Sequence, residues 1–367
     1  MKILAKAAVG IWLIVLAYFV WQGVMTQEWE GDSLAYHIPI ARNIAAGRWG
    51  NFDNWLEYYP GVGELILAGF MKLEIPLNLY NVAGWVFLFW VVRELGEIWG
   101  VGKDGATILA VAVGLLPSVV RLIPTQTVDI WLAVFGLLAV DQLISGSVFQ
   151  LKDWIKLGVF LGLLIGTKYS GLGSAAVLLA AAVWKTRSKN FLVAILVAVL
   201  VGGFWYVRNL VDRGHPLYPV GATNFHMLER RTWMIPVYYP AKFVEALFSE
   251  YLIWPLLGIV VTVTVNSNRI RWLGLLALGN FIVYLFIPAG VENVVSDLRY
   301  IYLVIIPLML AVFEWAKIHK REEELGILAI LMMAVELTQL DYHPKLFVIV
   351  LAGWYLRNWL PLRLSPR

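Results

Sequence analysis

The sequence predicts an all-α polytopic membrane protein with about twelve transmembrane helices. Hydrophobic residues make up 60% of the 367 residues, and charged residues only 15%. Apolar runs long enough to cross about 30 Å of hydrocarbon recur along the chain. Lysine and arginine stand at the ends of these runs instead of forming one basic face. Topology therefore explains the net charge of +4, and nucleic-acid binding is excluded.

The first apolar run, residues 3–24, is expected to stay in the membrane as an anchor. It follows Lys2 and Lys6 and has no clear small-residue cleavage site, so its N-terminus is predicted to be cytoplasmic. Basic residues then mark every second connection: Arg93 and Lys103; Lys152 and Lys156; Lys185, Arg187 and Lys189; Arg269 and Arg271; Lys317, Lys320 and Arg321. These connections are predicted to be cytoplasmic, which gives a multi-pass protein of the plasma membrane with both termini inside.

The predicted spans follow from this alternation. They cover residues 3–24, 78–95, 106–122, 129–145, 156–169, 172–185, 190–207, 253–267, 270–288, 299–316, 324–340 and 345–360. Residues 62–75 are apolar but short, and counting them as a span would move the basic cluster around Arg187 to the outer face. They are therefore predicted to form an interfacial helix within a first outer loop of residues 25–77.

The first outer loop is unusually rich in both charge and aromatic rings. Residues 28–61 read EWEGDSLAYHIPIARNIAAGRWGNFDNWLEYYPG. Rings sit favourably at a membrane interface, while carboxylates and cations can perform chemistry, so this loop is predicted to hold a polar head group at the bilayer edge. The other segments expected on this outer face are 121–129, 168–170, 208–251, 289–299 and 341–345.

Asp32 is the first candidate catalytic residue. At the outer end of the first span it suits a general base that deprotonates an acceptor hydroxyl or amine, or a ligand for a divalent metal. The structural alternative is an N-cap, because Asp-Ser precedes the helix-forming run LAYHIPIARNIAAG. The two roles are compatible.

Three cations are expected at outer helix ends, where the positive-inside rule disfavours them. They are Lys168 in GTKYSG, Arg208 in WYVRN and Arg299 in DLRY. Together they would form a clamp for an anionic lipid phosphate, with arginine as the bidentate donor and lysine as the point charge. The alternative for Lys168 is an ammonium that snorkels to the membrane edge without a functional role.

The remaining candidates each have a structural alternative. Asp129 in PTQTVD begins a span, where a carboxylate is favoured by the helix dipole and often acts only as a cap. Glu57 before YYPG is either a solvated loop charge or a second acidic group of the site. His37 near Asp32 is a weak signal for a metal ligand, so a divalent metal stays open and no cofactor is assigned.

Several classes of chemistry have no support in the sequence. The chain contains no cysteine, which removes disulfides, thiol catalysis and cysteine-based metal sites. It also has no HExxH, GxSxG, P-loop or dinucleotide-binding glycine motif.

The ordered motifs resemble the integral-membrane GT-C glycosyltransferases, the superfamily of protein O-mannosyltransferases and lipid A aminoarabinose transferases. The resemblance rests on GDSLAYHIPIARNIAAGRW after the first span and then EYYPG, PTQTVD, GTKYSG, WYVRNLVDRGHPLYP and DLRYIYLVIIP. It covers most of residues 1–220 and the motif around Arg299. No single motif is specific for this superfamily, but the ordered set of motifs is.

The resemblance implies an enzyme that uses a polyprenyl-phosphate sugar donor. Transfer would occur at the extracytoplasmic face to an unidentified protein, lipid or glycan acceptor. Asp32 would be the catalytic carboxylate, with Glu30, Glu57 or Asp129 as a second one. Lys168, Arg208 and Arg299 would bind the lipid phosphate, and Tyr36, His37 and Tyr59 complete the substrate-binding set.

The chain also departs from the family pattern. Ser33 follows Asp32 where several relatives have a second acidic residue, and Tyr59, Pro60 and Gly61 stand where relatives often have His-Pro-Pro. The expected organisation is a GT-C-like module over 1–210, an outer loop over 211–252, and C-terminal transmembrane helices over 253–367 with no soluble domain.

Two other functions are weighed against this one. A transporter or flippase of lipid-linked oligosaccharides would fit twelve spans, but transporters usually carry polar groups at mid-membrane and two similar halves, neither of which is visible here. A polysaccharide polymerase or ligase shares the lipid-linked donor, but typically has its main outer loop late in the chain. Here the expected outer loops are early and in the middle.

Overall fold

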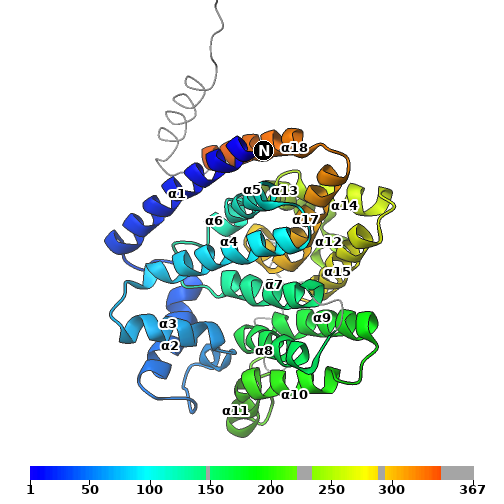
Figure 1. The fold of residues 1–367 in the computed structure, drawn as a ribbon. Helices are drawn as coiled ribbons and strands as arrows, with labels where there is room; N and C mark the ends of the chain where they lie inside the picture. Colours follow the sequence, from blue (N-terminus) through cyan, green and yellow to red (C-terminus); the bar gives the residue numbers. More distant parts are fainter. Residues whose placement is uncertain (146–148, 221–233, 288–293, 340–367) are drawn as a thin grey trace, which may run out of the picture.

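The computed structural model describes residues 1–145, 149–220, 234–287 and 294–339. The regular elements in these ranges are helices, as the sequence predicts, and they pack into one bundle (Figure 1). The predicted span 345–360 lies outside the described residues.

Most of the predicted spans in the first half correspond to single helices. They are α1 (Lys2–Met25), α4 (Tyr80–Ile98), α7 (Asp129–Ser145), α8 (Leu151–Thr167) and α9 (Ser170–Thr186). The predicted span 106–122 is instead divided into α5 (Lys103–Gly114) and α6 (Pro117–Val120). Pro117 has no N–H to continue α5 but fits the first turn of a new helix, which explains the break.

The predicted span 190–207 is also broken. It forms α10 (Phe191–Gly202) and α11 (Phe204–Arg213), which meet at an angle of 59°. The small residues Gly158, Gly162 and Gly202 let α10 lie against α8, since a Cβ on any of them would collide with the other helix. The bend directs α11 toward the first loop.

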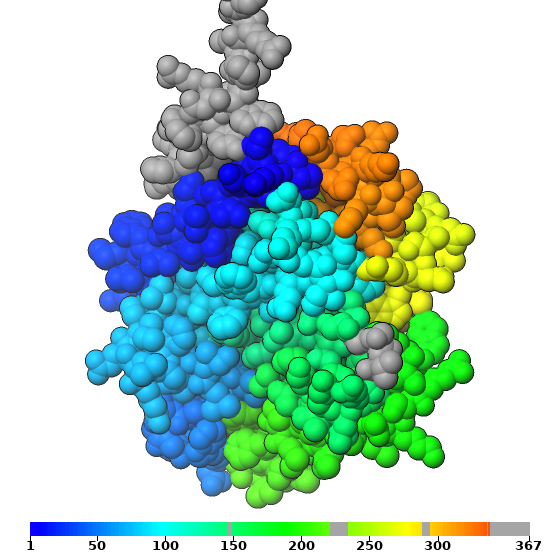
Figure 2. Space-filling view, in the orientation of Figure 1, coloured from blue at the N-terminus to red at the C-terminus, as the bar shows by residue number. Residues whose placement is uncertain are grey.

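The C-terminal half surrounds a buried central helix. It contains α12 (Ile235–Tyr238), α13 (Pro240–Tyr251), α14 (Trp254–Thr264), α15 (Asn268–Leu285), α16 (Val294–Asp297), the 3₁₀ turn η6 (Leu298–Ile301), α17 (Tyr302–Ile318) and α18 (Glu322–Gln339). The stretch 211–252, expected as an outer loop, thus contains α12 and α13. α17 lies inside the bundle, whereas α1 lies at its edge with exposed apolar side chains such as Trp21 and Val24 (Figures 1 and 2).

The helix lengths do not confirm the predicted count of about twelve crossings. Among the described residues, Lys2–Met25 and Val294–Ile318 are long and apolar enough to cross a membrane, and the number rises to four if each of two bent pairs forms one span. These pairs are α10 with α11 and α13 with α14. Several predicted spans are helices that are shorter or carry more charge.

The first loop is itself helical and folds against α8 and α11. It contains the π-helical turn η1 (Ser33–His37), α2 (Ile38–Ala45), the 3₁₀ turn η2 (Trp55–Tyr58) and α3 (Val62–Lys72). With 11 residues α3 is about 16 Å long, too short to span, which agrees with the predicted interfacial helix. Figure 2 shows this part of the chain, in blue, beside the green residues of α10 and α11.

Candidate functional site

Asp32 stands at the start of the π-helical turn η1, and its carboxylate does not cap that turn. Glu30 takes the capping role, because its carboxylate accepts hydrogen bonds from the backbone N–H of Ser33 at 2.6 Å and from the Ser33 hydroxyl at 2.8 Å. The Asp32 carboxylate, which is 40% exposed, instead accepts a hydrogen bond from Arg299 Nη2 at 2.6 Å. The structural alternative for Asp32, an N-cap, is therefore not what its side chain does.

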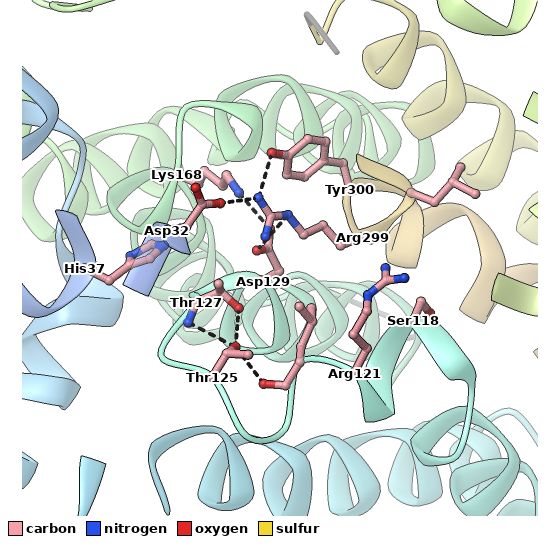
Figure 3. A network of polar contacts seen from close by, with 12 residues as sticks. Asp32, His37, Ser118, Arg121, Thr125, Thr127, Asp129, Lys168, Arg299 and Tyr300 are labelled. Atoms are coloured by element: carbon pink, nitrogen blue, oxygen red, sulfur yellow. Dashed lines mark hydrogen bonds and ion pairs between the residues drawn. The ribbon is translucent and has the colours of Figure 1, made fainter. Parts of the chain in front are cut away.

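Arg299 and Asp129 extend this pair into a network of four charges (Figure 3). Arg299 Nε lies 3.5 Å from Asp129 Oδ2, and Lys168 Nζ donates to Asp129 Oδ1 at 2.8 Å. The network alternates carboxylate and cation in the order Asp32, Arg299, Asp129, Lys168. Its net charge is zero when all four groups are ionised.

Each of these side chains comes from the end of a different helix. Asp129 opens α7, Lys168 follows the last residue of α8, and Arg299 lies in η6 before α17. The Lys168 ammonium also lies 4.2 Å from the centre of the Tyr300 ring, a cation–π contact. Residues separated by up to 267 positions thus meet at one end of the bundle.

The turn before Asp129 is held by hydrogen bonds from Asn81 and Gln126, two buried residues that sequence reasoning missed. The Asn81 side chain donates to the carbonyls of Leu122 at 3.1 Å and Thr127 at 2.8 Å. The Gln126 backbone N–H donates to the Ser33 hydroxyl at 2.9 Å, which ties this turn to the segment that carries Asp32. Asn81 and Gln126 therefore fix the spacing between the two carboxylates.

The electrostatics of the network keep its groups charged. Burial raises the pKa of Asp32, but the charge and hydrogen bond of Arg299 outweigh it and hold the pKa below its usual value. Burial lowers the pKa of Lys168, but the neighbouring Asp129 carboxylate reverses this and raises it above its usual value. At neutral pH Asp32 is an anion and Lys168 is a cation.

A cavity of about 510 Å³ opens beside the network. Its polar lining includes Asp32, Tyr36, His37, Tyr59, Glu64, Lys168, Arg299 and Tyr300, and its apolar lining includes Leu172, Val283, Phe286 and Ile287. These four apolar residues belong to α9 and α15 or follow α15 directly. The cavity therefore combines cations and carboxylates with hydrocarbon surface.

His37 and Glu64 form a hydrogen-bonded pair in the wall of this cavity. His37 Nδ1 lies 2.6 Å from Glu64 Oε1, and the two side chains are only 2% and 1% exposed. Sequence reasoning missed Glu64, although a single carboxylate within the apolar run VGELILAGF was a signal that it needs a partner.

Tyr36 and Tyr59, both predicted to bind substrate, line the cavity and contact each other with ring centres 5.4 Å apart and ring planes tilted by 39°. Arg208, predicted as part of the phosphate clamp, does not line it. Its Nη2 donates to the carbonyls of Tyr58 at 2.7 Å and Tyr59 at 3.3 Å, and its guanidinium lies over the Trp205 ring. Arg208 thus holds the first loop against α11.

Glu57 is likewise apart from the four-charge network. Its carboxylate accepts a hydrogen bond from the Asn43 amide, and the side chain is not among those that line the cavity. Burial raises the pKa of Glu57, against the effect of this hydrogen bond. Asp129, rather than Glu57, is the second carboxylate that the structure brings to Asp32.

The described residues contain no group of three histidine, aspartate or glutamate side chains arranged to hold a metal ion. In this part of the chain the carboxylates of Asp32 and Asp129 contact Arg299 and Lys168 instead.

The fold is similar to that of a known membrane transferase. No protein-family model and no curated protein sequence matches the chain. Two crystal structures of ArnT from Cupriavidus metallidurans do match, with TM-scores of 0.63 and 0.61 and identities of 16% and 14%. Both matches cover 95% of this chain, and 68% and 67% of ArnT. ArnT is an aminoarabinose transferase with the GT-C fold, and in the first structure it is bound to undecaprenyl phosphate. The predicted GT-C resemblance is therefore confirmed as a likeness of fold, that of a polytopic membrane protein.

Proposed function

We propose that this protein is a glycosyltransferase that moves a sugar from a polyprenyl-phosphate carrier to an acceptor at the extracytoplasmic face of the membrane. The observation that carries the proposal is the placement of Lys168 and Arg299 beside Asp32 in one cavity with an apolar side. The likeness of fold to ArnT, which was crystallised with undecaprenyl phosphate, supports the same class of ligand.

A polyprenyl-phosphate sugar needs two kinds of surface. Its long hydrocarbon chain cannot leave the bilayer, so it requires an apolar entrance, which the residues of α9 and α15 at the cavity provide. Its phosphate requires cations, for which Lys168 and Arg299 are the nearest candidates in the cavity wall. Of the three cations predicted for the clamp, Lys168 and Arg299 line the cavity, whereas Arg208 donates to loop carbonyls.

In the proposed reaction the bond between the anomeric carbon and the phosphate oxygen breaks. Its electron pair stays on the departing lipid phosphate. Lys168 and Arg299 stabilise the negative charge that grows on this phosphate in the transition state more strongly than they stabilise the bound donor. Asp32 takes the proton of the acceptor hydroxyl or amine as the new bond to the anomeric carbon forms. Asp129 positions both cations, because it contacts Lys168 and Arg299 from a fully buried site.

The tyrosine rings beside the network suit the sugar. Tyr36 and Tyr59 contact each other in the cavity wall and offer apolar ring faces and hydroxyls, which would pack against a pyranose ring and donate hydrogen bonds to its edges.

Two measurements on purified protein in detergent test the proposal. Undecaprenyl phosphate should bind, and Lys168→Ala or Arg299→Ala should weaken binding about tenfold to a hundredfold, the effect of one charge-assisted contact. The protein should release sugar from radiolabelled undecaprenyl-phosphate sugars without any ion gradient, which distinguishes a transferase from a transporter. Absence of both binding and release across a panel of sugars would reject the function.

A further inference from the structure

The His37–Glu64 pair has features that a purely structural hydrogen bond does not need. His37 Nε2 and Glu64 Oε2 are buried and have no hydrogen-bond partner among the described residues. Both side chains line the 510 Å³ cavity. An unpaired buried polar atom is unfavourable, so these two atoms need a partner that the described residues do not supply.

The pair also fixes the chemical form of the imidazole. An ionised carboxylate only accepts hydrogen bonds, so the short contact with Glu64 places the imidazole proton on Nδ1. Nε2 is then left with a free lone pair. A base whose orientation and tautomer are set by a carboxylate is the arrangement that activates hydroxyl groups in many enzymes.

The π-helical turn explains why His37 and Asp32 serve the same cavity. The Ile38 N–H donates to the Ser33 carbonyl, five residues earlier, so this turn is wider than an α-helical one. Positions 32 and 37 therefore come to one side of the turn, and both residues line the cavity. The other charged or titratable groups that line the cavity are Glu64 from α3, Tyr36 in the same turn, Tyr59, Lys168, Tyr169, Arg299 and Tyr300.

Asp32 alone is a poor final holder of a proton. Its ion pair with Arg299 lowers its pKa, so the protonated acid would be unstable at neutral pH. A proton taken up by Asp32 would therefore pass on to another base, and His37, which lines the same cavity, carries an imidazole that can accept it.

We propose that His37, oriented by Glu64, receives the proton that the acceptor loses during sugar transfer. This rests on the proposed function. The acceptor oxygen bonds to the anomeric carbon, the bond to phosphate breaks with its electron pair on the lipid phosphate, and the proton moves to Asp32 and then to His37 Nε2. His37 releases it to water before the next turnover, which leaves Asp32 again as a carboxylate. Glu64 is a positioning residue.

The test compares two nucleophiles on a radiolabelled undecaprenyl-phosphate sugar that the parental protein hydrolyses. Water must lose a proton when it attacks, whereas the azide anion has none to lose. His37→Gln should slow hydrolysis about a hundredfold but leave formation of the glycosyl azide within threefold of the parent. Glu64→Gln should slow hydrolysis by about tenfold. Undecaprenyl phosphate should still bind to both variants, which would show that the cavity remains folded.

A matched control is His215→Gln, because His215 does not line the cavity and its Nδ1 accepts only a local hydrogen bond from the Leu217 N–H. It should behave like the parent. Equal loss of hydrolysis and azide reaction in His37→Gln would mean general damage to the site and would overturn the proton role, as would parental hydrolysis. If the parental protein neither binds undecaprenyl phosphate nor releases sugar, the proposed function itself fails, and the relay with it.

A readout independent of turnover checks the tautomer. In protein labelled with ¹⁵N-histidine, the signal lost in His37→Gln should show a protonated Nδ1 and an unprotonated Nε2 at neutral pH. Glu64→Gln should change that tautomer balance. A His37 signal with the proton on Nε2 would overturn the proposal.

Discussion

Replacement of Lys168 separates the structural and functional parts of the charge network. Lys168 is 18% exposed and Asp129 is fully buried, with 2.8 Å between ammonium and carboxylate. Breaking a buried ion pair typically costs 3–5 kcal/mol because one charge is left without its partner. Arg299 at 3.5 Å still faces Asp129, so we expect Lys168→Ala to lower the free energy of unfolding by about 2–3 kcal/mol.

The double variant Lys168→Ala with Asp129→Asn removes both charges and tests what the lysine does besides pairing. It should recover most of the lost stability, because no unpaired carboxylate remains. It should not recover affinity for undecaprenyl phosphate, which we expect to stay about tenfold to a hundredfold below the parent.

The assay follows unfolding in detergent by tryptophan fluorescence and binding of undecaprenyl phosphate by titration calorimetry on the same samples. Recovery of affinity together with stability in the double variant would refute the reasoning, because Lys168 would then serve only to neutralise Asp129. Thermal stability equal to the parent in Lys168→Ala would show that the ion pair is not formed.

Three further predictions concern other residues. Asp32→Asn should lower turnover about a hundredfold to ten-thousandfold. Undecaprenyl phosphate binding and the melting temperature should change little, because the Asp32 carboxylate does not cap a helix. Parental turnover on a lipid-phosphate sugar would remove Asp32 from the mechanism. Arg208→Ala should make the first loop more sensitive to limited proteolysis, because Arg208 donates to the carbonyls of Tyr58 and Tyr59. It should weaken undecaprenyl phosphate binding less than Lys168→Ala does. A larger loss of binding in Arg208→Ala than in Lys168→Ala would return Arg208 to the phosphate clamp. A single cysteine at position 187, in a chain with no other, should react with an impermeant reagent only from the cytoplasmic side, and labelling from outside would contradict the predicted topology.

The helices were predictable where apolar runs and basic flanks coincide. The predicted spans 3–24 and 129–145 match α1 and α7 closely, because these runs are continuous and have few alternatives. The break before α6 has a local cause in Pro117 that the sequence displays. The bend between α10 and α11 depends on glycines that face α8, and only the packing of the two helices identifies that contact.

The meeting of Asp32, Asp129, Lys168 and Arg299 followed from topology, because each residue was expected at an outer helix end. The positions of Arg208 and Glu64 could not be obtained in this way. Arg208 bonds to backbone carbonyls, which every residue possesses and which leave no sequence signal. Glu64 pairs with His37 across 27 residues, and nothing in the apolar run around it indicates that partner.

The most direct test of the central claim is an experimental structure with undecaprenyl phosphate bound. The phosphate should lie within hydrogen-bond distance of Lys168 Nζ and Arg299, with its chain leaving between α9 and α15. A second cavity of about 520 Å³, almost wholly apolar, lies among α13, α14, α15 and α17 and offers another place for a lipid. A lipid bound only there, with no phosphate near Lys168, would contradict the proposed site.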